Sequence, residues 1–79
     1  MDAARLKWQC RRGMLELDLM LDSFVDKVWP GLSEQQKLTF DTLLDYPDQL
    51  LFDYLLGDAV PTDGEMMHVI TQIRQAAAD

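Results

Sequence analysis

The stretch of this sequence most suited to recognition chemistry is CRRGMLELD, residues 10–18, in which two arginines precede a glycine and acidic residues follow. One interpretation is structural: Gly13 ends a helix, and Arg12 pairs with Glu16 on the surface, where such a pair contributes only about 0–1 kcal/mol. The other is functional: the missing side chain at Gly13 lets the backbone of a partner protein approach closely. Arg12 and Glu16 would then supply a directional donor and acceptor on either side. The residue types alone leave both interpretations open.

The chain has one cysteine, Cys10, and one histidine, His68. This excludes an internal disulfide and a Cys/His metal site, and it indicates a reducing compartment. Arg11 and Arg12 would favour a reactive thiolate at Cys10, but we expect a small packed thiol, because nothing else in the sequence completes a nucleophilic triad. The sequence therefore predicts no catalytic residues, no metal site and no enzymatic activity.

Two further patterns have a functional and a structural interpretation. The run LDSFV, residues 21–25, resembles the D-S-L of acyl carrier proteins, but Ser23 falls inside a helix with apolar periodicity, whereas the modified serine of a carrier begins a helix. An acyl-carrier-like protein is therefore the less favoured alternative. Asp18, Asp22 and Asp26 repeat every four residues. We expect a solvated helix face here, because oxygen-rich cation loops need turns and a glycine at set positions.

With 79 residues, 48% of them hydrophobic, the chain suits one folded domain, residues 1–79, and is too short for a second core. Its formal net charge is −7, yet four of its seven bases lie in the first twelve residues. We therefore expect neither nucleic acid nor an anionic membrane as a partner, but a protein with its own charge pattern. No apolar run approaches the roughly 20 residues of a membrane span, and no leader is evident. The sequence predicts a cytoplasmic protein without membrane insertion.

Apolar residues recur at helical spacing and no segment alternates like a strand, which predicts an all-α fold. We expect a compact bundle of five short helices. The first two cover about residues 3–12 and 15–28, the third follows Ser33, the fourth ends before Gly57, and the fifth follows Thr62.

Two of these helices begin with a capping-box pattern, Ser33 with Gln36 and Thr62 with Glu65. The buried faces are predicted from the apolar spacing of each helix. They comprise Leu17, Met20, Leu21, Phe24 and Val28; Phe40, Leu43 and Leu44; Leu50, Leu51, Tyr54 and Leu55; and Met66, Val69, Ile70, Ile73 and Ala77.

The run WQCRRGMLELDLMLDSF, residues 8–24, resembles the small succinate dehydrogenase assembly factors, also called flavinylation factors. Their R-G-x-x-E motif stands here as Arg12, Gly13 and Glu16, inside a longer C-R-R-G-M-x-E-x-D stretch that also matches. The resemblance continues through LSEQQKLTFDTLLDYPDQLLFDYLLG and PTDGEMMHVITQIR, so it covers nearly the whole chain. A bare R-G-x-x-E would be a weak motif, whereas the extended run in a chain of this size is specific.

The resemblance implies a five-helix protein that binds the flavoprotein subunit of succinate dehydrogenase, and that of fumarate reductase as a related client. It implies that the chain promotes covalent attachment of FAD to a histidine of that partner, with no FAD bound stably to the chain itself. The motif places the contact centre at Arg12, Gly13 and Glu16.

Arg5, Trp8 and Arg11 are added to the expected contacts because they lie nearby. Trp8 would be an aromatic anchor if exposed, although we expect it to lie half in the core. We expect a monomer. An antitoxin-type interaction module, a label also given to bacterial proteins of this kind, is the alternative function.

Overall fold

In the computed structural model, residue 6 and residues 8–78 are described, and all regular structure within them is helical. The elements are α2 (Leu15–Lys27), the 3-10 turn η1 (Trp29–Gly31), α3 (Glu34–Leu44), α4 (Asp48–Leu55) and α5 (Gly64–Ala78). The prediction of an all-α fold is thus confirmed for the described part of the chain, and the element bounds lie close to those expected.

The predicted count of five helices is not confirmed. Four α-helices are assigned in the described residues, and much of the expected first helix, residues 3–12, lies outside them. Leu6, Trp8 and Gln9 have helical backbone, but Arg11 and Arg12 do not. Helical geometry therefore stops earlier than the sequence predicted.

Local sequence explains where α3 and α5 begin. The Ser33 hydroxyl accepts a hydrogen bond from the Gln36 amide at 3.2 Å, and the Gln36 side chain accepts one from the Ser33 amide at 3.1 Å, as predicted. The prediction for α5 was wrong. The residue before its first residue is Asp63, whose carboxylate accepts from the Glu65 amide at 3.0 Å, so the cap lies one residue after Thr62.

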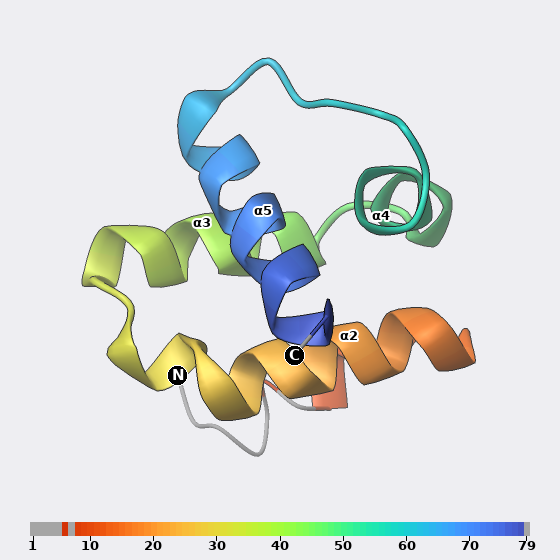
Figure 1. The fold of residues 1–79 in the computed structure, drawn as a ribbon, viewed down its shortest axis with the longest axis horizontal. Helices are drawn as coiled ribbons and strands as arrows, with labels where there is room; N and C mark the ends of the chain where they lie inside the picture. Colours follow the sequence, from red (N-terminus) through yellow and green to blue (C-terminus); the bar gives the residue numbers. More distant parts are fainter. Residues whose placement is uncertain (1–5, 7, 79) are drawn as a thin grey trace.

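Helix α5 packs across α2 and α3, and α4 packs against α2 and α5 beside them (Figure 1). The Cα radius of gyration is 11.3 Å and the overall extents are 29 × 27 × 25 Å. No helix in the described residues is both long and apolar enough to cross a membrane. Residues 45–47 and 56–63 connect α4 to α3 and α5, and Asp48 at the start of α4 contacts the site described below.

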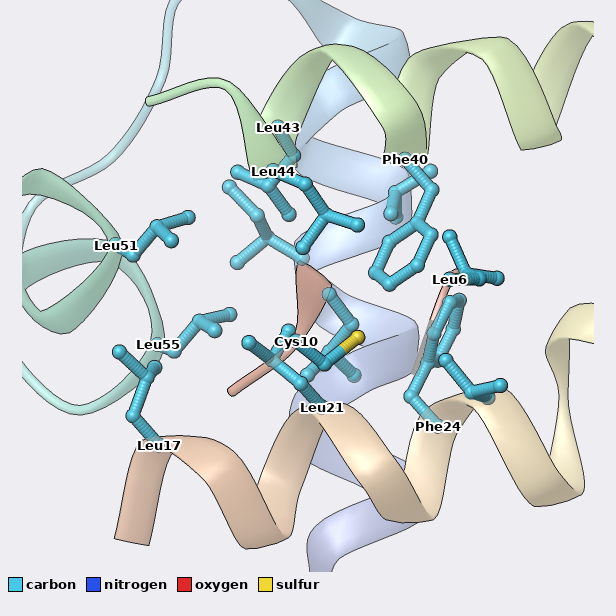
Figure 2. Packing of buried hydrophobic residues seen from close by; sticks show 14 of the residues in the cluster. Leu6, Cys10, Leu17, Leu21, Phe24, Phe40, Leu43, Leu44, Leu51 and Leu55 are labelled. Carbon is cyan, nitrogen blue, oxygen red and sulfur yellow. The ribbon is translucent and has the colours of Figure 1, made fainter. Parts of the chain in front are cut away.

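The core lies where the inner faces of the helices meet (Figure 2). Phe24 of α2 and Phe40 of α3 are fully buried, with their ring centroids 4.8 Å apart. Leu6 and Cys10 from the N-terminal segment are also buried and join this cluster. Cys10 is 1% exposed, which confirms the expected packed thiol. The N-terminal segment is therefore held in place by core packing just before the motif.

The predicted inner faces are largely confirmed, although four of the predicted residues are only half-buried: Met20, Val28, Leu50 and Tyr54. Val25 is buried although it was not on the expected stripe. In α5, Ala76 is buried and Ala77 is exposed, the reverse of the prediction. The position of Ala76 follows from Ile73, which lies three residues earlier on the same helix face.

Candidate functional site

Gly13 forms an exposed turn between the N-terminal segment and α2. Its φ is +79°, and among the described residues it is the one with positive φ. A Cβ built on Gly13 would meet no atom within 4 Å, so the space beside it is open. Glycine adopts this left-handed geometry without the steric cost that other residues incur. The position thus offers both an unusual backbone shape and an uncovered surface.

Gly13 does not terminate the first helix, contrary to the prediction. The last helical hydrogen bonds before it run from the Cys10 amide to the Leu6 carbonyl and from the Arg11 amide to the Trp8 carbonyl, each 3.2 Å long. Gln9 is the last residue with helical backbone, so the non-helical residues 10–12 separate that helical segment from Gly13. The left-handed geometry therefore serves the entry into α2, not the end of the preceding helix.

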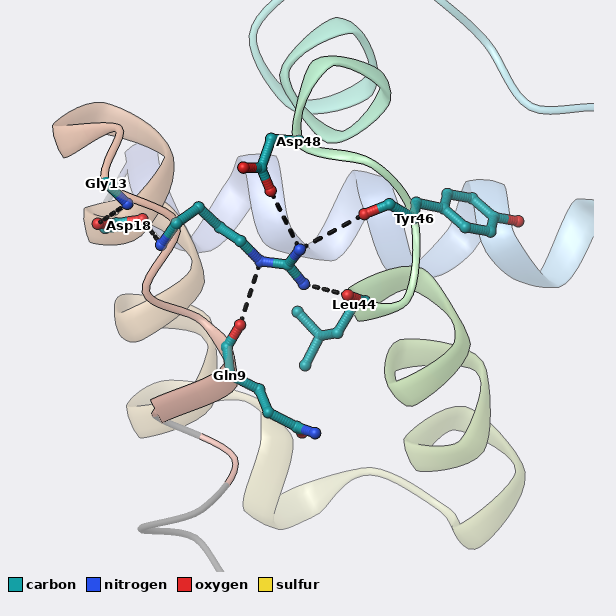
Figure 3. Close-up of polar contacts among 7 residues, drawn as sticks. Gln9, Gly13, Asp18, Leu44, Tyr46 and Asp48 are labelled. Atoms are coloured by element: carbon teal, nitrogen blue, oxygen red, sulfur yellow. Dashed lines mark hydrogen bonds and ion pairs between the residues drawn. The ribbon is translucent and has the colours of Figure 1, made fainter.

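Asp18, in the first turns of α2, binds the backbone of this turn. One carboxylate oxygen accepts from the Arg12 amide at 2.7 Å and the other from the Gly13 amide at 3.2 Å (Figure 3). Two successive N–H groups beside a left-handed residue form a concave site for an anion, and here the anion belongs to the same chain. Asp18 is half-buried. The prediction of a solvated aspartate face was therefore wrong for Asp18, while Asp22 and Asp26 are exposed as expected.

The Arg12 side chain points into the molecule and is 16% exposed. Its Nε donates to the Gln9 carbonyl at 3.1 Å, its Nη1 donates to the Tyr46 carbonyl at 3.4 Å, and its Nη2 donates to the Leu44 carbonyl (Figure 3). Leu44 is the last residue of α3, whose final carbonyl groups have no partner within the helix. Arg12 thus supplies the positive charge and the donor that the end of α3 lacks.

The ion pair of Arg12 is made with Asp48, not with Glu16 as the structural interpretation predicted. Nη1 lies 3.1 Å from the Asp48 carboxylate, at the first residue of α4. Arg12 therefore connects the N-terminal segment, the end of α3 and the start of α4. Glu16 is exposed on α2, and its carboxylate takes no part in this network.

The outward side of the site is partly apolar. Leu15 and Leu19 lie one helical turn apart on α2 and are 74% and 59% exposed. Arg11 and Glu16 are exposed nearby in the chain. Trp8 is 74% exposed, so the prediction that it lies half in the core was wrong and the conditional prediction of an exposed aromatic applies. Arg5 lies outside the described residues.

Leu19 stands between two hollows of the surface. On one side a cleft of about 530 Å³ is bordered by Glu16, Leu19, Met20 and Arg74, between α2 and the end of α5. On the other side a smaller hollow of about 230 Å³ is bordered by Arg11, Leu15, Asp18 and Leu19. We call the exposed pair Leu15 and Leu19 the apolar ridge; it lies near the Gly13 turn in the chain and was not predicted. The signal was available, because Leu15 and Leu19 lie off the buried stripe of Leu17, Leu21 and Phe24.

Two other candidates of the sequence are the acidic residues of α2 and Ser23. No group of three or more His, Cys, Asp or Glu side chains among them could hold a metal ion. Ser23 lies inside α2, is half-buried and donates to the Ala76 carbonyl at 3.5 Å. This position is unlike the exposed helix start that a carrier serine requires. The exposed residues around Gly13 are thus the best-formed site.

Comparison with known proteins identifies the relatives of this chain. A family described as "Flavinator of succinate dehydrogenase" matches residues 4–77. A protein of Coxiella burnetii named FAD assembly factor SdhE is 42% identical over 74 residues, which cover 94% of this chain and 90% of that protein. The protein of the same name from Shewanella oneidensis is 44% identical over 78 residues, 99% of this chain and 95% of that protein. The chain belongs to the flavinator of succinate dehydrogenase family, whose members are assembly factors and not enzymes.

Proposed function

We propose that this chain binds the flavoprotein subunit of succinate dehydrogenase and promotes the covalent attachment of FAD to it. The observation that carries the proposal is the exposed Gly13 turn, with its open side, in a chain of this family. The names of the relatives support the role in FAD assembly. The surface around Gly13 supports the docking of another protein, because an uncovered backbone, an exposed carboxylate and two exposed leucines lie together.

We place the chemistry of the flavin bond on the partner. FAD supplies its own electrophilic ring, so the assembly factor needs no catalytic acid or base. The factor acts by binding better to the conformation of the flavoprotein that aligns the acceptor histidine with the flavin. A preference of about 1.4 kcal/mol for that conformation favours it roughly tenfold. Gly13 permits close contact, Glu16 accepts hydrogen bonds from the partner, and Leu15 and Leu19 bury apolar surface.

Arg11, Trp8 and Arg5 complete the proposed contact surface. Arg11 and Trp8 are exposed, and Arg5 is included because of its position in the sequence. In this proposal the factor acts as a monomer and FAD stays with the flavoprotein. Size-exclusion chromatography with light scattering tests the first point, and equilibrium dialysis of the chain against FAD tests the second. A stable dimer or retained FAD would contradict these parts of the proposal.

The principal test measures covalent flavin on the partner. The purified flavoprotein of succinate dehydrogenase is incubated with FAD, with or without this chain, and covalent flavin is read by in-gel fluorescence. A parallel reaction uses the fumarate reductase flavoprotein as the second client. The wild-type chain should raise the signal, whereas Gly13→Val should remain helical by circular dichroism and fail to raise it. A folded Gly13→Val chain with full activity would overturn the assigned site.

A matched pair of leucines tests the apolar ridge. Leu19 and Leu38 have nearly equal exposure, 59% and 61%, but Leu38 lies on α3. Leu19→Ser should weaken binding of the flavoprotein, while Leu38→Ser should leave it unchanged, and both should unfold at nearly the same temperature as the wild type. Binding is measured by isothermal titration calorimetry. Equal affinities for the two variants would remove the ridge from the proposed surface.

A further inference from the structure

We propose that Arg12 and Asp18 are positioning residues that fix the Gly13 turn from inside the molecule. The partner then contacts Gly13 and Glu16 but not the Arg12 guanidinium. This inference rests on the proposed function for the identity of the partner. It changes the role of one residue of the motif from contact to support. It also adds Asp18, which lies outside the R-G-x-x-E residues.

The geometry around Arg12 carries the first step. Its guanidinium donates to three backbone carbonyls and to one carboxylate, and the side chain is 16% exposed. A partner could use these donors only by breaking bonds that close the end of α3, which would leave the Leu44 carbonyl without a donor. The planar, forked guanidinium can reach all these acceptors at once, whereas an ammonium group cannot. Arg12 is therefore suited to hold segments of this chain together.

The geometry of Asp18 carries the second step. Its two oxygens each accept one backbone N–H, from Arg12 and from Gly13. Because these two residues form the turn itself, the carboxylate fixes the backbone on both sides of the peptide bond that joins them. Arg12 then anchors the same turn to α3 and α4 through its side chain (Figure 3). The turn is held from two directions, while its outer side stays open.

Glu16 benefits from the same arrangement. It lies three residues after Gly13 in the first turn of α2, and Asp18 lies two residues further on. Fixing the turn against Asp18 therefore fixes Gly13 relative to the helix that carries Glu16. A partner that needs both residues at a set spacing would meet them already ordered, which lowers the entropy lost on binding.

The substitution Asp18→Asn tests the clamp in the full chain. Asparagine has nearly the same shape but only one acceptor oxygen, so one of the two backbone N–H groups loses its acceptor and faces a donor. We expect hydrogen exchange at the Arg12 and Gly13 amides, resolved by NMR, to accelerate at least about tenfold, while the Val69 and Ile70 amides in α5 stay protected. We also expect the affinity for the succinate dehydrogenase flavoprotein to fall at least about tenfold. Asp58→Asn removes the same charge from an exposed position and should change neither quantity.

Each result decides the inference. Weaker binding with unchanged amide exchange would mean that Asp18 contacts the partner directly. Faster exchange with unchanged binding would mean that the partner does not depend on the shape of the turn. Either result overturns the inference. A wild-type chain that fails to bind the flavoprotein overturns the proposed function alone, since the amide comparison still decides whether the clamp exists.

Arg12→Lys provides the second variant, in case Asp18→Asn folds poorly. Lysine keeps the positive charge but cannot reproduce the forked contacts. The NMR chemical shift of the Gly13 amide should therefore change, and its hydrogen exchange should be faster. Arg11→Lys, at the adjacent exposed position, should leave the chemical shift and the exchange rate of the Gly13 amide unchanged. An unaltered Gly13 amide in Arg12→Lys would overturn the role assigned to Arg12.

Discussion

Gly13 combines two properties that substitutions can separate. Its positive φ requires glycine for conformational reasons, and the open space beside it suits a partner's approach. The free energy of unfolding reports the first property, and affinity for the flavoprotein reports the second. A Cβ at this position would meet no atom of its own chain within 4 Å, so a steric effect of that carbon on affinity would come from the partner.

We predict that the two properties rank the same variants in opposite orders. Gly13→Ala should lower the free energy of unfolding by about 1–2 kcal/mol, and Gly13→Asn should lower it less, because asparagine tolerates the left-handed region better. Affinity for the flavoprotein should fall more for Gly13→Asn, because its side chain is larger. Urea denaturation and calorimetry measure the two quantities. If affinity followed stability across both variants, Gly13 would serve conformation alone.

At the scale of the helices, the last turns of α3 and α4 are completed by side chains from outside each helix. α3 begins with the Ser33 capping box and ends on the Arg12 guanidinium. α4 follows the same principle, because Arg74 of α5 donates to the Tyr54 carbonyl and, at 3.2 Å, to the Gly57 carbonyl. Neither α3 nor α4 has a basic residue in its own last turn. Arginines from other parts of the chain therefore complete both helix ends.

The start of α5 offers a prediction from two neighbouring residues. Asp63→Ala should lower the free energy of unfolding by about 1 kcal/mol, because it removes the side chain that accepts from the Glu65 amide. In a domain of this size, that corresponds to a fall in melting temperature of roughly 4–8 °C. Thr62→Ala should change the free energy by less than about 0.5 kcal/mol. Thermal unfolding followed by circular dichroism distinguishes the two, and a larger loss for Thr62→Ala would place the cap at Thr62.

The difference between local and distant determinants explains what the sequence could predict. The Ser33 cap depends on residues three apart, so its pattern is visible in the sequence and was confirmed. The partner of Arg12 could not be predicted in this way, because Asp48 lies 36 residues further along and meets it only through packing. Trp8 was misplaced for a related reason: apolarity predicts burial on average, but exposure depends on which face the chain presents.

For the molecule as a whole, stability depends on a small core. A domain of 79 residues buries a modest share of its surface, so each large buried side chain counts heavily. The contact between Phe24 and Phe40 links α2, which carries the site, to α3, whose last carbonyl group accepts a hydrogen bond from Arg12. A change in this ring pair should therefore affect the packing of the helix that carries the site.

We predict that Phe40→Ala lowers the free energy of unfolding by about 3–5 kcal/mol, a large part of the roughly 5–15 kcal/mol typical of native domains. Its binding to the flavoprotein should decline with the folded fraction. Leu38→Ala, on the same helix but exposed, should stay within about 0.5 kcal/mol of the wild type. Urea denaturation measures both values. A similar loss for both variants would contradict the burial of Phe40.

The contact between Arg12 and Asp48 joins segments that are synthesised at different times. The motif leaves the ribosome early, yet the groups that hold it in shape belong to residues 44–48, which are translated some thirty residues later. A nascent or truncated chain that ends before α4 would contain the motif residues but would lack the contact between Arg12 and Asp48. The final shape of the Gly13 turn thus depends on residues that lie more than thirty positions away in the chain.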